Sequence, residues 1–185
     1  MNTIIEQSKS PALELSVLKA HLRIAHDHED DYLKTVINMA TEILETNIEK
    51  PILKKKYRYV HYNDEFVSSR RITLPVREVR GIISVKELPP VAAVKEPLPD
   101  RKNDKVSYRV LNDNDRTIIV TNGSKRPIEI KYAAGMTGNA DKIPKDLQFA
   151  ILQIAKNIYE CSEEDVLESK YIKHIVNSHR TLSIN

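Results

Sequence analysis

The chain has 185 residues, of which 41% are hydrophobic and 30% charged, and its net charge is +3. These values are typical of a soluble globular protein of one domain and exclude an intrinsically disordered chain. The longest apolar runs are far shorter than the ~20 residues of a transmembrane helix, and the N-terminus carries no signal-peptide pattern. Cys161, the single cysteine, has no partner for an intramolecular disulfide. We therefore expect an intracellular protein that does not contact membranes.

Helical periodicity predicts four segments. A short helix covers 16–25, with Ser16 as its N-cap. The second runs over about 30–47, with acids at its N-terminal end, where the helix dipole favours them. The third covers 144–160, starting at a proline. A final helix is predicted over 163–176, before a tail of nine residues.

The helix predicted over 144–160 is apolar around most of its circumference. Its polar arc is narrow and consists of Gln148, Gln153, Lys156, Asn157 and Glu160. Such a helix is either central in its own fold or covered by a neighbouring subunit. We favour the central core helix.

Between the second and third helices the hydrophobic period changes to two. The predicted strands are 57–62, 72–74, 81–87, 106–111, 116–121 and 127–132. Turn-forming residues between the last three strands predict that these form a meander. Residues 89–104 hold four of the nine prolines and are predicted to form a loop, either functional in itself or an arm that contacts a partner.

The predicted fold class is therefore α+β: a small helical bundle of three to four helices with a β-strand insertion between the second and third helices. We expect a single domain over 1–185. Its predicted parts are a helix pair (13–50), the β insertion (51–132), the C-terminal helices (143–176) and the tail (177–185).

Residues that carry out catalysis or hold a metal are not gathered in any recognisable motif. The run His26-Asp27-His28-Glu29-Asp30-Asp31 is the densest cluster of metal-ligand residue types, but it has no second cluster to converge with, and helix N-terminal charge explains its acids. The sequence contains no glycine-rich phosphate loop, no Gly-x-Ser-x-Gly and no His-Glu-x-x-His. We expect no enzyme activity, no metal and no cofactor.

Charge is distributed unevenly. Residues 27–49 carry seven acids against one base, a balance of −6, and residues 51–80 carry eight bases against three acids, a balance of +5. This asymmetry indicates either subunits that meet through opposite charges or a basic surface facing an acidic partner, with ordinary solvated surface as the alternative. The candidate interface acids are Asp30, Asp31, Glu42 and Glu45, and the candidate bases are Lys54, Lys55, Lys56, Arg58, Arg70 and Arg71.

The bases of 54–62 alternate with tyrosines, a composition that contacts nucleic-acid backbones. On a strand, Lys54, Lys56 and Arg58 project from one face. The alternative is an edge strand that lysines protect from pairing.

Two ordered stretches carry a family resemblance. The first is Leu-Ser-Val-Leu-Lys-Ala-His-Leu-Arg-Ile at 15–24, followed by Asp-His-Glu-Asp-Asp-Tyr-Leu at 27–33. The second is Ile-Lys-Tyr-Ala-Ala-Gly at 130–135, followed by Ile-Pro-Lys-Asp-Leu at 143–147. Over about 13–50 and 127–160 the chain resembles the tailed-phage head–tail connector family, also called adaptor or head completion proteins, and its longer members that carry a β insertion.

The resemblance implies a structural protein of a virion, prophage particle or gene transfer agent. Its members form a homo-oligomeric, dodecamer-like ring between portal and tail and extend the DNA channel. The implied partners are other copies of itself, the portal protein, a tail or stopper protein, and DNA passing through without sequence preference. The implied location is the host cytoplasm during assembly and then the head–tail interface of the virion.

On this basis the acids are placed at subunit contacts and the bases toward DNA or a neighbour. The C-terminal segment, with Tyr171, Ile172 and Ile175, is expected to dock on the portal. The alternative functions are a small DNA-binding packaging-accessory protein and, less favoured, an enzyme with an unrecognised site.

Overall fold

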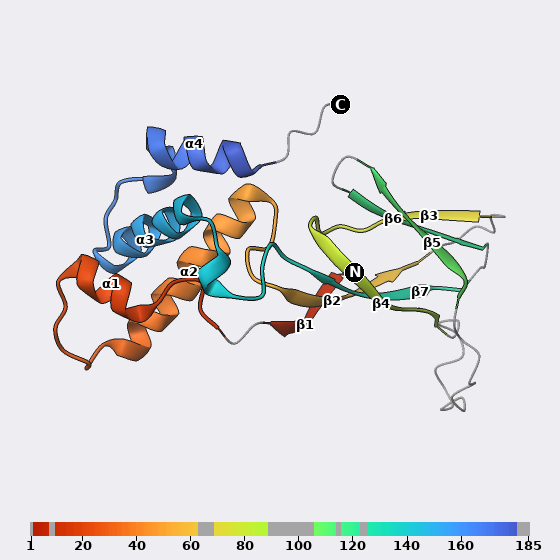
Figure 1. Cartoon of the computed structure of the whole chain (residues 1–185), viewed down its shortest axis with the longest axis horizontal. Helices are drawn as coiled ribbons and strands as arrows, with labels where there is room; N and C mark the ends of the chain where they lie inside the picture. Colours follow the sequence, from red (N-terminus) through yellow and green to blue (C-terminus); the bar gives the residue numbers. More distant parts are fainter. Residues whose placement is uncertain are drawn as a thin grey trace. The chain divides into compact units, whose positions relative to one another are not determined.

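The computed structural model describes residues 2–7, 10–62, 69–88, 106–113, 116–122 and 126–180. Within them the chain is mixed α+β, with four α-helices and two antiparallel sheets, which confirms the predicted class (Figure 1). The chain divides into two compact units. The β unit comprises residues 1–7 and 55–134, and the helical unit comprises residues 8–54 and 135–185. The predicted loop 89–104 lies outside the described residues.

The elements follow one another in an order close to the predicted one. In chain order they are β1 (Asn2–Gln7), α1 (Leu15–Leu22), α2 (Asp30–Ile48), β2 (Lys55–His61), β3 (Ser69–Thr73), β4 (Val79–Glu87), β5 (Tyr108–Asp113), β6 (Arg116–Asn122), β7 (Ile128–Ala134), α3 (Lys145–Tyr159) and α4 (Lys170–His179). Of these strands, six lie between α2 and α3 in the sequence, and β1 precedes α1. None of the described helices is long and apolar enough to cross a membrane.

The boundaries of two helices differ from prediction. Ser16 is not the N-cap of α1, because the cap is Glu14, whose side chain makes no capping hydrogen bond. This helix ends at Leu22 because Arg23 adopts a left-handed conformation with φ of 58°. The predicted helix 163–176 is instead a short 3₁₀ turn, Val166–Glu168, followed by α4. Ser169 starts α4 because its side chain accepts a hydrogen bond from the backbone N–H of Ile172, and α4 continues past 176 into the predicted tail.

The helical unit is built around α3. Its buried residues, Leu147, Ala150, Ile151, Ile154 and Ala155, recur at helical spacing. Helices α1, α2 and α4 all contact α3, so the predicted central position is confirmed. Phe149, on its opposite face, remains 46% exposed.

The β unit holds two sheets with strand orders β1-β2-β7-β4 and β3-β6-β5. The predicted meander is correct only for the β5–β6 hairpin, because β7 pairs with β2 and β4. Every residue of β7 except Lys131 is buried, as suits a strand with a neighbour on each side. Sequence patterning missed β1, since all six of its residues are exposed and no burial alternation marks it.

A tyrosine pair lies in the core of the β unit. The rings of Tyr57 on β2 and Tyr132 on β7 stack with centroids 5.3 Å apart. The Tyr132 hydroxyl donates to Oδ1 of Asn2 at 3.3 Å. Burial raises the pKa of Tyr132 well above its usual value, so the hydroxyl remains a donor at all physiological pH values. This contact attaches β1 to the core.

Gly135 follows β7 at a point where two segments of the helical unit run side by side. The backbone N–H groups of Met136 and Thr137 donate to the carbonyls of Pro51 and Ile52 at 3.0 and 3.1 Å. Gly135 has φ of +137°, and a Cβ there would lie 2.6 Å from the Leu53 carbonyl oxygen. Only glycine fits this close approach.

Candidate functional surfaces

The acidic cluster before α2 connects helices. Lys19 of α1 donates from Nζ to Oδ1 of Asp27 at 2.5 Å and to Oδ1 of Asp30 at 2.7 Å. These hydrogen bonds raise the pKa of Lys19 and lower that of Asp27. The rings of His26 and His28 stack with centroids 5.6 Å apart. Among the residues that the structure describes, no three or more His, Cys, Asp or Glu side chains are grouped to hold a metal ion.

Three of the four candidate interface acids have partners within the subunit. Asp30 binds Lys19, as above, and Asp31 pairs with Lys34 at 2.8 Å. Glu45 accepts from the backbone N–H of Ile52 at 2.8 Å and so stabilises the chain reversal after α2. These carboxylates contribute to the fold of the helical unit.

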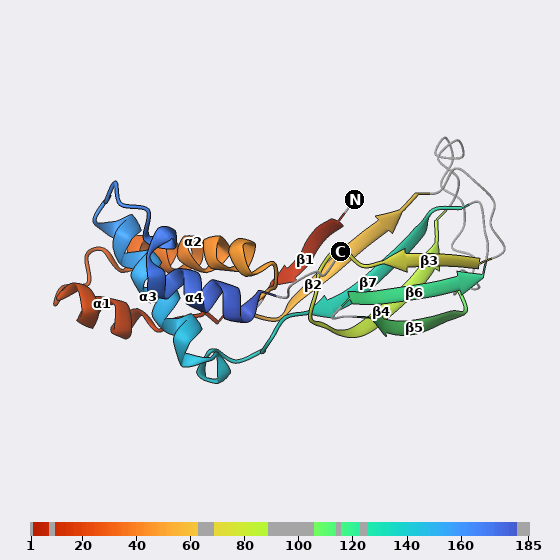
Figure 2. The same ribbon diagram turned by 90° about the horizontal axis from the view of Figure 1, so that it is seen from above.

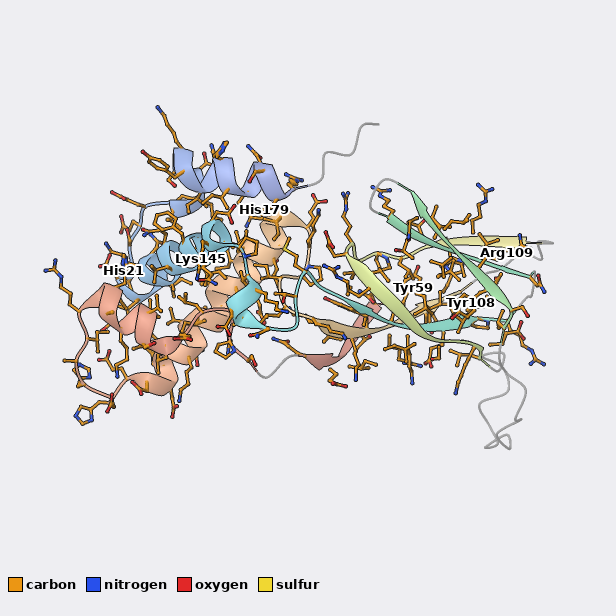
Figure 3. All side chains as sticks on the ribbon, in the orientation of Figure 1. His21, Tyr59, Tyr108, Arg109, Lys145 and His179 are labelled. Atoms are coloured by element: carbon orange, nitrogen blue, oxygen red, sulfur yellow. The ribbon has the colours of Figure 1, made fainter. Side chains whose placement is uncertain are left out.

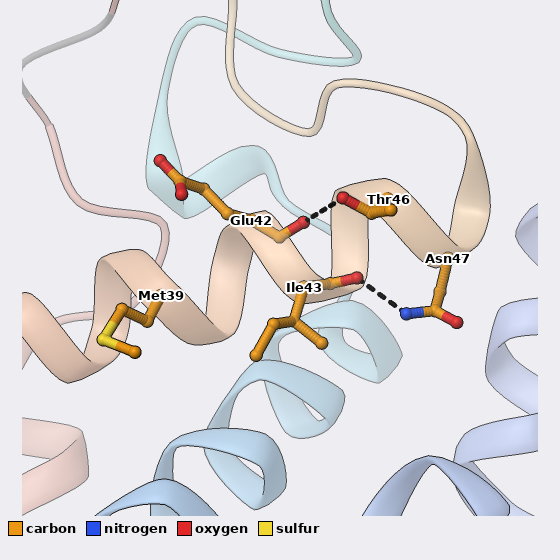
Figure 4. A pocket seen from close by; sticks show the side chains of 5 residues that line it. All are labelled: Met39, Glu42, Ile43, Thr46 and Asn47. Atoms are coloured by element: carbon orange, nitrogen blue, oxygen red, sulfur yellow. Dashed lines mark hydrogen bonds between the residues drawn. The ribbon is translucent and has the colours of Figure 1, made fainter.

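Glu42, the fourth acid, lies in a shallow groove of about 340 Å³ along α2 (Figure 4). The groove is lined by Met39, Glu42, Ile43, Thr46 and Asn47. Thr46 Oγ1 and Asn47 Nδ2 donate to carbonyls of their own helix at 2.8 Å, which satisfies both side-chain donors. Met39 is 47% exposed. An apolar strip with one carboxylate suits a protein partner better than a small charged ligand.

The bases of β2 point to both faces of the sheet. Lys55 is buried, whereas Lys56 and Arg58 are partly exposed on the opposite face. Lys56 Nζ pairs with Glu6 of β1 at 2.6 Å, and Arg58 Nε donates to Glu129 of β7. Strand β2 lies between β1 and β7, so the alternative prediction of an edge strand protected by lysines is wrong.

The remaining candidate bases lie elsewhere. Lys54 is exposed just before β2. Arg71 is exposed on β3, which belongs to the other sheet. Arg70 is also on β3, but its side chain lies outside the described part of the structure. Of the candidate bases of the β unit whose side chains are described, Lys56 and Arg58 share one face of β2, Lys55 lies on the other face, and Arg71 belongs to the other sheet.

Strand register adds two bases to those of β2. Arg58 stands opposite Lys131 of β7, and Lys86 of β4 stands opposite Glu129. Residues paired across an antiparallel sheet share a face. Lys56, Arg58, Lys86 and Lys131 therefore form one surface, the basic sheet face, with Glu129 in its centre. Sequence reasoning missed Lys86 and Lys131 because they come from separate strands, and only the pairing brings them together.

The three candidate portal-docking residues, Tyr171, Ile172 and Ile175, differ in their exposure to solvent. Ile172 is 1% and Ile175 9% exposed, and both pack in the core of the helical unit, whereas Tyr171 is 80% exposed. At the other end of α4, Nε2 of His179 lies 2.6 Å from Oδ2 of Asp146 at the start of α3 (Figure 3). Burial opposes ionisation of Asp146, but the His179 contact and the Leu147 N–H hold the pKa of that carboxyl below its usual value. Of the three candidates, Tyr171 is the side chain presented to solvent.

Residues 13–79 match the family of phage gp6-like head–tail connector proteins. The chain resembles the head–tail connector family. This match confirms the resemblance drawn from the first signature and covers α1, α2, β2 and β3. Comparison with curated protein sequences gives no match.

Solved structures similar to this chain come from gene transfer agent (GTA) particles. A chain in the neck of an empty GTA particle computed with C6 symmetry has a TM-score of 0.75 at 18% identity, covering 100% of this chain and 97% of that chain. A chain in the virion of a native GTA particle has a TM-score of 0.73 at 20% identity, with 100% and 97% covered. A chain in the neck of a native GTA particle computed with C12 symmetry has a TM-score of 0.66 at 19% identity, with 99% and 97% covered. At such identities the likeness is one of fold.

Proposed function

We propose that this protein is a structural head–tail connector, a ring subunit between the portal and the tail of a phage, prophage or GTA-like particle. The observation that carries the proposal is the likeness of fold along the whole chain to chains of GTA necks. The family match over 13–79 supports the same role. The C6 and C12 symmetries of those necks support a dodecamer-like ring. The helical unit is then the bundle of the family and the strands after α2 its β insertion.

The ring contact is proposed to include α2. Glu42 is the candidate acid with no side-chain partner among the described residues, and it borders the apolar groove of Met39 and Ile43. Such a surface combines apolar area with one charge that selects the partner. Asp30 and Glu45 bind donors outside α2, whereas the exposed Asp31 pairs with Lys34 within the same helix.

The basic sheet face is proposed to face DNA in the channel. Its bases are partly exposed, but Glu6 and Glu129 neutralise part of their charge. Phosphate contact by such a surface is weak, salt-dependent and independent of sequence, as suits DNA that must slide. A small DNA-binding accessory protein is less favoured, because the fold matches neck components along the whole chain.

Portal docking is proposed to use Tyr171. Exposed tyrosines supply large contact area with few rotatable bonds and are frequent in the energetic centre of interfaces. Ile172 and Ile175 fix α4 on the helical core and so position Tyr171. A tail or stopper protein is proposed to bind the ring on its other side.

The test is the solution mass of the full chain by light scattering over a wide concentration range, with electron microscopy of large species and co-sedimentation with portal rings of the parent particle. We expect closed rings, alone or on the portal, and loss of portal retention in Tyr171→Ala. A chain that neither closes into rings nor sediments with the portal would overturn the connector function.

A further inference from the structure

Strand β5 lies at one edge of the three-stranded sheet β3-β6-β5. Among the described strands it pairs only with β6, in an unbroken register from Tyr108 opposite Thr121 to Asp113 opposite Arg116. Val110 and Leu111 are each 45% exposed. Because successive side chains of a strand point to opposite faces, half-exposure of both means that each face of β5 is open to solvent.

Edge strands expose unpaired N–H and C=O groups, and proteins usually protect them with bulges or charges. Strand β4, an edge of the other sheet, has two register shifts against β7. Strand β3 carries two adjacent arginines, Arg70 and Arg71, among its five residues. Strand β5 keeps an unbroken register against β6 and presents the apolar side chains of Val110 and Leu111 beside a single arginine, Arg109 (Figure 3). Such an edge is suited to pairing with a strand of another chain.

We propose that β5 of one subunit pairs with β1 of the next copy, so that the sheets continue from subunit to subunit. This rests on the proposed ring. Figure 2 shows β1 and β5 at opposite lateral edges of the β unit. Contact between two different edges is heterologous and repeats around a ring, whereas pairing of β5 with itself would stop at a dimer.

Strand β1 suits β5 better than β3, the other edge on the same side. Both β1 and β5 have six residues. Strand β1 has one register shift against β2, between Ile4 and Glu6, and pairs regularly from Asn2 to Ile4. Ile4 and Ile5 of β1 are each 48% exposed and match the apolar surface of Val110 and Leu111. The carboxylate of Glu6 pairs with Lys56 but is exposed, and its charge is complementary to that of Arg109, whereas the charge of Arg71 on β3 repels Arg109.

The first test blocks the edge. Val110→Lys places a charge on β5 at a half-exposed position, so the fold is retained, and the matched control is Ile83→Lys on β4, where Ile83 is 51% exposed. By light scattering we expect Val110→Lys to lose the oligomer and Ile83→Lys to keep it, with unchanged circular dichroism in both. Arg109→Glu is expected to weaken assembly and Arg109→Glu with Glu6→Lys to restore it. Normal assembly of Val110→Lys and Arg109→Glu would overturn the proposal.

The second test identifies the partner strand. In a Cys161→Ser background, chains with both Ile4→Cys and Val110→Cys are expected to give a reducible ladder of linked oligomers on oxidation. A ladder from Arg71→Cys with Val110→Cys instead would overturn the choice of β1. If rings form but neither cysteine pair gives linked oligomers, the β5 contact is overturned and the connector function stands. A chain that never assembles, even on the portal, overturns both.

Discussion

Arg180, the residue after α4, donates from Nε and Nη2 to Oε1 of Glu49, the residue that ends α2, at 3.1 and 2.5 Å. The two residues are 131 positions apart in the sequence. Together with the contact between His179 and Asp146, this pair fixes the C-terminal end of α4 to the two longest helices. Helix α4, which carries the proposed portal contact Tyr171, is therefore held on its own subunit at its C-terminal end as well as by its buried face.

Alanine substitutions at two adjacent residues of α4 are expected to differ strongly in their effect on the free energy of unfolding. Ile172→Ala removes a side chain that is 1% exposed and is expected to cost about 2–5 kcal/mol of unfolding free energy. Tyr171→Ala removes one that is 80% exposed and is expected to cost about 0.5 kcal/mol or less. Urea unfolding measures both. Equal losses in the two variants would contradict the burial of α4.

Gly135→Ala is expected to destabilise the helical unit by about 2 kcal/mol or more, because the backbone has positive φ and the new Cβ meets the chain at Leu53. The matched control is Gly138→Ala, where a Cβ meets nothing within 4 Å. Thermal unfolding of the two variants gives the comparison. If both variants have the melting temperature of the unmodified chain, the close approach at Gly135 is absent in solution.

The hydroxyl of Tyr159 donates to Oε2 of Glu29 at 2.8 Å, and this bond raises the pKa of Tyr159 above its ordinary 10.0. A group whose pKa is raised in the folded state stabilises the fold as long as it is protonated. This stabilisation is complete below the pKa of the unfolded chain and is lost as the pH rises through the pKa of the folded state. We expect Tyr159→Phe to be less stable than the unmodified chain near neutral pH, with the difference shrinking above about pH 10. Urea titrations across this range measure it, with Tyr171→Phe as control. A difference that stays constant with pH would exclude the titration of Tyr159 as its cause.

Replacing Lys86 and Lys131 together by alanine is expected to weaken binding to duplex DNA. The slope of log affinity against log salt should fall by about 0.9 for each phosphate that the variant no longer neutralises. The control, Lys145→Ala with Lys156→Ala, removes the same charge from α3. Fluorescence anisotropy at several salt concentrations gives both slopes. Equal slopes in the two double variants would mean that net charge alone, and not the basic sheet face, binds DNA.

Local patterns in the sequence determined most of the secondary structure. Helix α2 was predicted to within one residue, and six strands were located, because one-sided burial imposes a period of 3.6 or 2 on apolar residues. Strand β1 left no such trace, since neither of its faces is buried. The first family signature was also readable from the sequence and lies within the family match, and Gly135 in the second stretch has a steric reason.

Only the tertiary structure decided which strands pair with one another and which charged side chains find a partner. The turns after β5 and β6 suggested a meander, yet β7 pairs along one edge with β2 and along the other with β4, strands that are far from it in sequence. Lys86 and Lys131 join Arg58 on one face through register, which depends on contacts between residues far apart in sequence. Among the candidate acids, Asp30 and Glu45 looked equivalent to Glu42 in sequence, and only the fold supplied the donors that bind the first two. Composition and periodicity act within a few residues, whereas burial and charge pairing depend on which distant segments meet.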